Sequence, residues 1–445
     1  MQIGLTQPRP RALLRRLLEA ALKAADPAPA LLRHVTRTGP ILSVGRQRYD
    51  LRDYDRVIAV GAGKASAPMA AALEQRLGKR LAEGLVIVKY GHTVPTKTIR
   101  ILEAGHPAPD RAGQRATAQL RSLLGRLTAK DLLFVLLSGG ASSLLPAPVP
   151  GVTLAEKRET TERLLRCGAT IHEINAVRKH LSSIKGGQLV SSTKARVVSL
   201  ILSDVLGDEL GTIGSGPTAP DPTTYAEACA TLRRYKLWDK VPASIRTHLL
   251  KGRRGAEKET PKPGSPLFGQ VQNEIIGNNG NAVEAVAKAA REAGLRPLVL
   301  TTTLTGEARE AAKTFGAIAR ELVASDRPVL RPACLIAGGE LTVTRRGRGL
   351  GGRAQEFALA SAQEIAGLPQ IWVAGFGTDG TDGPTDVAGA VVDGRSIDRA
   401  KKAGLSQAEA LARNDSYRFF AKLGGHIKTG PTGTNVNDLY LLMAL

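Results

Sequence analysis

The chain has 445 residues with a formal net charge of +22, and 42% of its residues are hydrophobic. This length is long for one hydrophobic core and predicts two or three domains. The three cysteines include no CxxC pair, so neither a disulfide framework nor a zinc site is indicated. No apolar run approaches the roughly 20 residues of a membrane span, so we expect a cytoplasmic protein without a membrane partner.

The excess of basic residues allows two interpretations. A basic surface can bind nucleic acid through phosphate contacts, or it can attract small anions more generally. Aromatic residues make up only 4% of the chain, which argues against a stacking platform for single-stranded nucleic acid. The sequence also contains no helix-turn-helix, zinc-finger or RNA-binding signature. A basic nucleic-acid-binding protein is therefore the less favoured alternative, and no specific nucleic-acid partner is expected.

The N-terminal segment predicts an amphipathic helix. A Glu and a Lys interrupt its apolar run, which argues against a secretory signal. Its leucines share one helical face, at Leu13, Leu14, Leu17, Leu18 and Leu22.

Apolar runs that end in glycine loops and lead into helices dominate the rest of the chain. The expected strands, with their glycine ends, cover 56–64, 85–89, 132–140, 197–204, 297–301, 334–340 and 370–375. The expected helices cover 65–77, 282–293 and 305–323. Continuously apolar strands are buried on both faces, as in parallel sheets with helices on each side. The pattern predicts α/β architecture, and the polar segment 251–266 indicates a surface loop or domain boundary.

Five glycine loops follow these strands, and most of them carry polar or charged side chains. In open α/β sheets, ligands bind at the carboxyl ends of the strands. The loops cover 61–64, 138–143, 203–208, 338–340 and 377–386. We therefore expect them to converge on an active cleft.

The loop Gly61-Ala-Gly63-Lys64 is a candidate anion site. Backbone N–H groups at the start of a helix bind phosphate, and Lys64 adds a positive charge. The spacing is not that of a Walker A loop, and a dinucleotide fingerprint would need a third glycine near Ser66. The alternative is a tight strand-to-helix turn with a solvated lysine.

The second loop, Ser138-Gly139-Gly140-Ala-Ser142-Ser, offers hydroxyl and N–H donors after a strand. Such a loop could hold an anion of the substrate or nucleotide. A nucleophilic serine is less favoured, because the sequence around Ser142 lacks the second glycine of a G-x-S-x-G elbow.

Acidic and basic side chains follow two further strands. Asp204 ends one strand and could take a hydroxyl proton or hold Mg²⁺, while Asp208 either functions or caps the next helix. Arg353, after paired glycines, could fork onto a carboxylate or phosphate. Glu340 ends an apolar strand and is a candidate metal ligand, whereas Glu356 could serve the helix dipole.

The loop 377–386 carries three carboxylates, on Asp379, Asp382 and Asp386. The spacing is not that of an EF-hand, and Mg²⁺ usually takes one or two carboxylates with substrate phosphates. Asp379 and Asp382 are the metal candidates, and an Asx turn would account for one of the three acids. A second polar loop, 428–438, contains Asn435 as a candidate ligand contact, and it either closes onto the cleft or supports the acidic loop.

Taken together, these segments resemble the glycerate 2-kinase family with a MOFRL domain, a family often provisionally labelled hydroxypyruvate reductase. The resemblance spans nearly the whole chain in order, and it rests on residues 60–65, 105–110, 137–148, 174–187, 203–205, 214–218, 377–386 and 429–438. The family's essential lysine falls on Lys64, and its arginine falls on Arg353. The chain departs from the family at Ala354, where Asn is usual, and at Ala141-Ser142, where a third glycine is common.

The resemblance implies two α/β domains with the active cleft between them. The first, residues 1–250, would be a Rossmann-like, largely parallel sheet, and the second, 267–445, the MOFRL domain, whose C-terminal segment could return to the first. The implied reaction transfers the γ-phosphoryl of ATP to the 2-hydroxyl of D-glycerate, with Mg²⁺, in a monomer or homodimer.

The residues can be matched to this reaction. Phosphoryl transfer needs positioning and cations against phosphate charge. Lys64 and Arg353 would stabilise the anion, and Asp204 would partner the hydroxyl or the metal. His180 could face the carboxylate of glycerate, or it could be a satisfied structural histidine. The alternative activity, an NAD(P)H-dependent hydroxypyruvate reductase, would need an acid about 20 residues after the glycines. Glu83 has that spacing, but the third glycine is missing.

Overall fold

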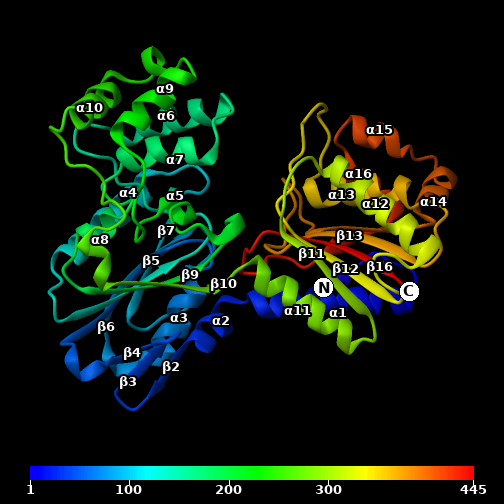
Figure 1. Cartoon of the computed structure of the whole chain (residues 1–445), viewed down its shortest axis with the longest axis horizontal. Coiled ribbons are helices and arrows are strands. Elements are labelled where there is room, and N and C mark those ends of the chain that lie inside the picture. The colour runs from blue at the N-terminus through cyan, green and yellow to red at the C-terminus, as the bar shows by residue number, and fades with distance from the viewer. The chain divides into compact units, whose positions relative to one another are not determined.

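The computed structural model describes all 445 residues and divides into two compact units (Figure 1). Residues 27–276 form one unit, called here the Lys64 unit, and residues 1–26 with 277–445 form the other, called the Arg353 unit. The division differs from the expected limits of 1–250 and 267–445. Helix α1 (Pro8–Ala25) packs against α11 (Asn279–Glu292), so the N-terminal residues group with the C-terminal half.

A six-stranded sheet in the order β10-β9-β8-β5-β6-β7 forms the centre of the Lys64 unit. The pairings of β5 with β6 and β8, of β6 with β7, and of β8 with β9 are all parallel. Every residue of β8 is buried, as expected for a strand with helices on both faces. The strands are β5 (Arg56–Ala62), β6 (Leu81–Lys89), β7 (Ile99–Ala104), β8 (Asp131–Leu137), β9 (Arg196–Leu202) and β10 (Val271–Gly277).

Helices cover both faces of this sheet. Figure 1 shows α3 (Ser66–Leu77) on one face, and α4 (Arg111–Gly125) with the short α5 (Ala141–Leu144) on the other. Beside α3 lie α2 (Pro27–His34) and a three-stranded antiparallel sheet. That small sheet consists of β2 (Val35–Thr38), β3 (Ile41–Val44) and β4 (Gln47–Asp50).

Four further helices of the Lys64 unit have a hydrophobic cluster of their own. They are α6 (Leu154–Arg166), α7 (Ile171–His180), α9 (Tyr225–Arg234) and α10 (Ala243–Arg253), and the short α8 (Gln188–Ser191) follows α7. Helices α6, α7 and α9 each begin with a Thr-x-x-Glu capping box. These helices are absent from the elements expected from the sequence, although their capping boxes are visible in it.

The Arg353 unit contains a seven-stranded sheet in the order β1-β15-β14-β13-β16-β12-β11. Only β11 and β12 are parallel, and the other pairings are antiparallel. The C-terminal strand β16 lies between β12 and β13, so it belongs to the interior of this sheet. The strands are β1 (Gln2–Ile3), β11 (Arg296–Leu304), β12 (Ala333–Gly339), β13 (Ile371–Gly377), β14 (Gly389–Asp393), β15 (His426–Lys428) and β16 (Asp438–Ala444).

Helices also cover both faces of the second sheet. Figure 1 shows α1 and α11 on one face, and α12 (Ala308–Ser325) and α13 (Arg353–Glu364) on the other. Three short helices complete the α13 side, namely α14 (Ser396–Lys402), α15 (Gln407–Ala412) and α16 (Ser416–Leu423). No helix of the chain combines the length and the apolarity that a bilayer crossing requires.

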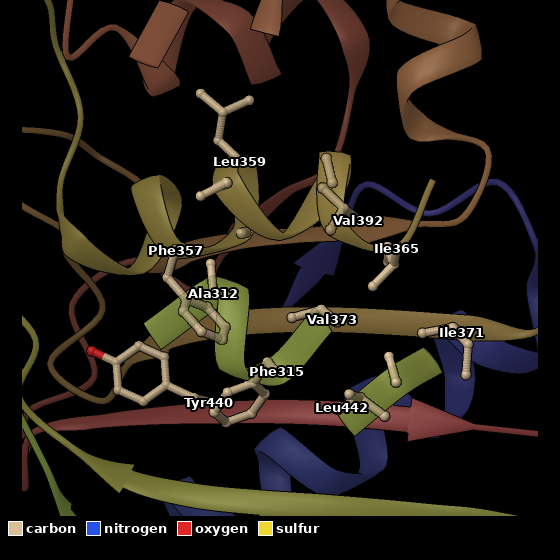
Figure 2. Close-up of a cluster of buried hydrophobic side chains, with 14 of the residues drawn as sticks. Ala312, Phe315, Phe357, Leu359, Ile365, Ile371, Val373, Val392, Tyr440 and Leu442 are labelled. Carbon is tan, nitrogen blue, oxygen red and sulfur yellow. The ribbon is translucent and has the colours of Figure 1, made fainter. Parts of the chain in front are cut away.

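Three aromatic rings join the helices of the α13 side to the centre of the sheet (Figure 2). Phe357 of α13 packs edge-to-face on Phe315 of α12, with ring centroids 5.0 Å apart. The same ring packs on Tyr440 of β16 at 4.8 Å. Phe357 is fully buried and contacts both elements, so it is central to this core.

We predict that Phe357→Ala destabilises the Arg353 unit by about 3–5 kcal/mol, because it removes a buried aromatic ring and leaves a cavity. Differential scanning calorimetry should show a lower unfolding temperature for this unit. Leu330→Ala is the control, since Leu330 is 58% exposed and its truncation should cost less than about 0.5 kcal/mol. Equal shifts for the two variants would contradict the assignment of Phe357 to the core.

Candidate functional site

The turn between β5 and α3 is held by hydrogen bonds to the loop that follows β8. The backbone N–H of Lys64 donates to the carbonyl of Gly139 at 2.8 Å. The N–H of Ala65 donates to the Ser138 hydroxyl at 3.0 Å, and that hydroxyl also contacts the Ser66 hydroxyl at 3.0 Å. The first two predicted glycine loops therefore lie side by side and form one rigid corner.

The glycines of this corner allow close approach of neighbouring groups. A Cβ on Gly61 would collide with the backbone of Leu136 on β8, and one on Gly63 would collide with Ser138. Gly140 has φ +86°, and a Cβ there would lie 2.8 Å from the His106 ring. Glycine is required at these three positions for packing, whether or not a ligand binds there.

Lys64 is half-buried at this corner, and its ammonium group makes no hydrogen bond or ion pair within the chain. Burial lowers the pKa of the neighbouring His106 to about 4, and the positive charges of Lys64 and Lys89 add to that effect. His106 is therefore neutral at pH 7. Lys64 is a cation with no acidic partner, next to backbone at the start of a helix.

Two of the predicted serines use their hydroxyl groups within the protein. Ser138 is 1% exposed and holds the two loops together, as described above. The Ser142 hydroxyl contacts the Ser215 hydroxyl at 2.9 Å, and Ser215 donates to Asn175 at 3.0 Å. These contacts give both serines a structural role.

Asp204 follows the carboxyl end of β9 and is half-buried. Its strand is the neighbour of β8, so Asp204 lies at the same edge of the sheet as the Ser138 loop. Asp208, four residues later, adopts a left-handed backbone with φ 55° inside a short turn. It therefore does not cap a long helix.

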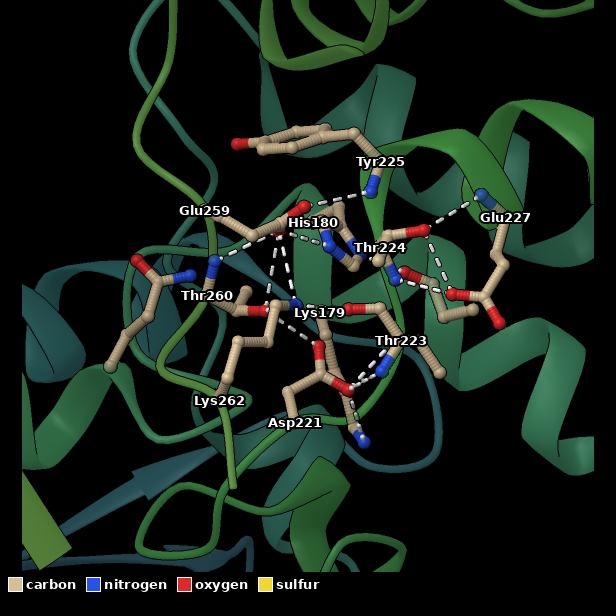
Figure 3. A network of polar contacts seen from close by, with 12 residues as sticks. Lys179, His180, Asp221, Thr223, Thr224, Tyr225, Glu227, Glu259, Thr260 and Lys262 are labelled. Carbon is tan, nitrogen blue, oxygen red and sulfur yellow. Dashed lines mark hydrogen bonds and ion pairs between the residues drawn. The ribbon is translucent and has the colours of Figure 1, made fainter. Parts of the chain in front are cut away.

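The ring of His180 is fully engaged in a structural network (Figure 3). It is 1% exposed, and its two nitrogens contact the Ala176 carbonyl at 2.6 Å and the Glu259 carboxylate at 2.7 Å. The contact with His180 is one of several that hold the pKa of Glu259 at about 2, against the effect of burial. This geometry favours the structural alternative over contact with a substrate carboxylate.

In the Arg353 unit, Arg353 begins helix α13 and forks onto Asp438 at the start of β16. Its Nε and Nη2 donate to the two carboxylate oxygens at 2.5 and 3.2 Å. Its Nη1 donates to Glu340, after the end of β12, at 2.5 Å. Both carboxylates raise the pKa of Arg353 against the effect of burial. The fork that the sequence suggested for a ligand is occupied here by a carboxylate of the chain.

Asp438, the partner of Arg353, is not among the candidate residues identified from the sequence. It is 3% exposed and also accepts a hydrogen bond from the Tyr440 hydroxyl at 2.8 Å. Burial raises its pKa to about 6, although Arg353 acts in the opposite direction. The available signal was its position as the single acid of an otherwise apolar terminal strand.

The three carboxylates of the acidic loop have different environments. Asp382 is buried and accepts from the backbone N–H groups of Ala354 at 3.1 Å and Gln355 at 2.8 Å, so it caps α13. Burial raises the pKa of Asp382. Asp386 is exposed and accepts from the Tyr417 hydroxyl at 2.6 Å. Asp379 is half-buried and forms the Asx-type turn that the spacing suggested.

These environments bear on the expected metal site. No group of three or more His, Cys, Asp or Glu side chains is placed to hold a metal ion. Of the three metal candidates, Asp382 is committed to α13 and Glu340 to Arg353. Asp379 uses only Oδ1, which accepts from the N–H and the hydroxyl of Thr381 at 3.0 and 3.1 Å. Its other oxygen fits a metal that arrives with phosphates, since such a metal needs only one or two carboxylates.

The C-terminal polar loop supports the acidic loop. The Thr432 hydroxyl donates to the Thr378 carbonyl at 2.6 Å, and the Thr378 hydroxyl donates to the Asn437 carbonyl at 2.6 Å. The Asn435 side chain accepts from the N–H of Asn437 at 3.2 Å. The two loops therefore form one rigid structure beside the end of β13.

A cavity of about 560 Å³ lies beside these loops within the Arg353 unit. Arg353, Asp379 and Asp382 line it, together with Glu356 and Asn414. Glu356 is itself paired with Arg309 at 2.6 Å and with Asn414 at 3.1 Å. Its role is therefore not limited to a favourable interaction with the dipole of α13. Ala354, the departure noted after Arg353, is fully buried and does not line the cavity.

Two family models match the chain. One is described as a domain of unknown function, DUF4147, and matches residues 13–250. The other is the MOFRL family and matches residues 333–438. Their order and extent agree with the segments on which the sequence resemblance rests.

Individual proteins match over almost their whole length. A protein of Pyrococcus horikoshii named glycerate 2-kinase is 42% identical over 96% of this chain and 95% of its own. A protein of Agrobacterium vitis, provisionally named hydroxypyruvate reductase, is 41% identical over 97% of this chain and 94% of its own. A solved structure titled glycerate kinase, from Thermotoga maritima, has a TM-score of 0.87 and 39% identity, with 99% of this chain and all of that chain covered.

We predict that Asp438→Asn changes how the stability of the Arg353 unit depends on pH. A carboxyl whose pKa is higher in the folded than in the unfolded chain binds its proton more tightly when folded. That contribution is fully present below the unfolded pKa, near 3.9, and is lost as the pH rises through about 6. Between pH 4 and 7, the free energy of unfolding of wild type should fall by at most about 3 kcal/mol more than that of the Asn variant.

The measurement is the unfolding temperature of both proteins by calorimetry across this pH range. Asp386→Asn is the matched control, because Asp386 is an exposed carboxyl of the acidic loop whose pKa is lowered. Its profile should keep the fall seen in wild type. Parallel profiles for wild type and Asp438→Asn would contradict the raised pKa.

Proposed function

This chain belongs to the glycerate 2-kinase family with a MOFRL domain, and we propose that it transfers the γ-phosphoryl group of ATP to the 2-hydroxyl of D-glycerate. The observation that carries the proposal is the corner at Gly63-Lys64. There an unpaired, half-buried ammonium lies at a strand-to-helix turn on the ligand-binding edge of a parallel sheet.

Phosphoryl transfer suits such a corner, because the protein does little covalent chemistry in this reaction. It positions the reactants and places cations where charge spreads over the transferred group. The corner is rigid, since Ser138 holds both loops, so Lys64 would lose little freedom on binding a phosphate. We assign Lys64 to that phosphate and Asp204 to the attacking hydroxyl group.

Arg353 differs from Lys64 in that carboxylates of the chain already pair with it. Its guanidinium group is shared between Asp438 and Glu340, which leaves two of its five N–H groups without these partners. The remaining donors could bind an oxyanion in the cavity that Arg353 lines. The two carboxylates also fix the direction of the side chain, as a preorganised catalytic group requires.

A magnesium ion carried by ATP would supply positive charge that offsets the phosphate oxygens during transfer. Asp379 is the residue that we expect to hold it, because one of its carboxylate oxygens is not engaged within the chain. Asp382 and Glu340 are less suited, since both are committed to other partners.

We predict that the intact protein forms 2-phosphoglycerate from ATP and D-glycerate, and that Lys64→Ala lowers kcat/KM by roughly 10²–10³, the usual effect of losing one donor to a transition-state anion. An assay coupled to enolase detects 2-phosphoglycerate and does not respond to 3-phosphoglycerate. Lys130→Ala, which changes an exposed lysine just before β8, should retain wild-type activity.

Two results would contradict the proposal. One is the absence of turnover of D-glycerate by the intact protein with several nucleotide donors. The other is oxidation of NADH in the presence of hydroxypyruvate, which would support the reductase alternative. The third position of a dinucleotide fingerprint is Ser66, whose hydroxyl instead donates to the Leu136 carbonyl at 3.2 Å.

We further predict that Asp379→Asn raises the Mg²⁺ concentration needed for half-maximal activity by roughly tenfold, because a neutral amide is a weaker ligand for a hard cation. Titration of activity with Mg²⁺ at fixed ATP measures the change. Asp386→Asn alters an exposed carboxyl of the same loop and should leave the titration unchanged. Identical curves for both variants would remove Asp379 from the metal site.

A further inference from the structure

Four basic side chains line a second cavity, which lies within the Lys64 unit and has a volume of about 340 Å³. Arg158 is exposed, whereas the other three, Lys157, Arg178 and Lys185, are buried or half-buried. Lys157 belongs to α6 and Arg178 to α7, while Lys185 follows α7 in the chain. The hydroxyl-bearing residues Ser142 and Ser143 of α5 also line the cavity. Three separate elements thus bring positive charge and hydroxyl groups to one space.

None of the three cations has an acidic partner. Lys185 is 1% exposed, and its ammonium donates to the Ser142 carbonyl at 2.6 Å. Lys157 is 7% exposed, and its ammonium donates to the Leu181 carbonyl at 2.8 Å. Arg178 is half-buried and makes no hydrogen bond or ion pair within the chain. Buried charges are normally paired, so three unpaired cations around one cavity need an explanation.

The neighbours of Arg178 on the same helix show the usual arrangement (Figure 3). Lys179 is buried and paired with Asp221 at 3.2 Å, and His180 contacts Glu259 at 2.7 Å. The protein thus supplies carboxylates to the two following residues, but none to Arg178. On this helix, the lack of an acidic partner is therefore confined to the residue that lines the cavity.

The unpaired cations are costly to the protein. Burial lowers the pKa of Lys157 to about 7, and repulsion from Arg178 adds to this effect. Burial lowers the pKa of Lys185 well below its ordinary value, and Lys157 and Arg178 lower it further. A bound anion would offset both the burial and the repulsion.

We propose that Lys157, Arg178 and Lys185 form a binding site for the oxyanion group of a small molecule, a carboxylate or a phosphoryl group. The guanidinium of Arg178 can fork onto either group, and the Ser143 hydroxyl, which has no partner within the chain, can donate to it. Pro107, Pro109, Pro146 and Leu154 give the cavity an apolar wall, which suits a compact ligand. At the rim, Glu162 is exposed and lies 3.8 Å from Arg166, so it does not neutralise the buried cations.

The test is calorimetric titration of the full chain with three separate probes: inorganic phosphate, AMP and D-glycerate. The site predicts that at least one probe binds, and that Lys185→Met and Arg178→Leu each weaken this binding by roughly tenfold or more. Lys194→Met, which changes an exposed lysine whose side chain makes no hydrogen bond or ion pair, should bind as wild type. Phosphate and AMP binding without D-glycerate binding would identify a phosphoryl site, and the reverse would identify a carboxylate site.

Thermal stability separates this role from a purely structural one. Met is similar in size to Lys and lacks the amino group whose charged form burial disfavours, so Lys185→Met should unfold at the same temperature as wild type or higher. Phosphate should raise the unfolding temperature of wild type more than chloride at equal ionic strength, and should not do so for Lys185→Met. If Lys185→Met does not fold, Arg178→Leu decides the question alone.

Three outcomes would overturn the proposal: no probe binds, the variants bind as tightly as wild type, or Lys194→Met loses binding equally. Binding is measured with one probe at a time and without turnover. A protein that binds phosphate at this site but does not phosphorylate glycerate would therefore keep this inference and lose the proposed function.

Discussion

The ion pair between Arg353 and the buried Asp438 fixes the site of the Arg353 unit. It joins the first residue of α13 to the first residue of β16, an interior strand of the sheet. Asp382 secures the same end of α13 by accepting from two of its N–H groups. Loss of Arg353 would leave the buried carboxylate of Asp438 without its charged partner and destabilise the unit, so the position of the helix start is tightly specified. The side chains of Arg353 and Asp382, which line the cavity beside this helix start, are therefore held in fixed positions.

Much of the α/β architecture could be predicted from the sequence, because strands such as β8 are continuously apolar and buried on both faces. The helices α6, α7, α9 and α10 could not be predicted in the same way. Their sequences are rich in charged residues, and their apolar stripes are covered by one another instead of by the sheet. Three of these helices nevertheless begin with a capping box, a local signal that does not depend on tertiary packing.

The site was less predictable than the fold, because a sequence pattern identifies reactive side chains but not their partners. Asp379, Asp382 and Asp386 are close in sequence, yet one forms a turn, one caps a helix and one contacts Tyr417 at the surface. The partner of Arg353 lies 85 residues away in the chain. Glycine was ambiguous for a similar reason, since Gly61 and Gly63 are required for packing as well as for any ligand.

The pairing of charges, more than their number, separates candidate ligand sites from structure in this basic chain. A net charge of +22 means that many cations lack an acid, and at the surface water solvates them at little cost. Burial changes this balance, because an unpaired cation loses that solvation. Lys179 and Arg353 replace the lost solvation with carboxylates of the chain. Lys157 and Lys185 replace it only with carbonyl oxygens. A cation that remains unpaired where burial is costly indicates a place where an external anion completes the structure.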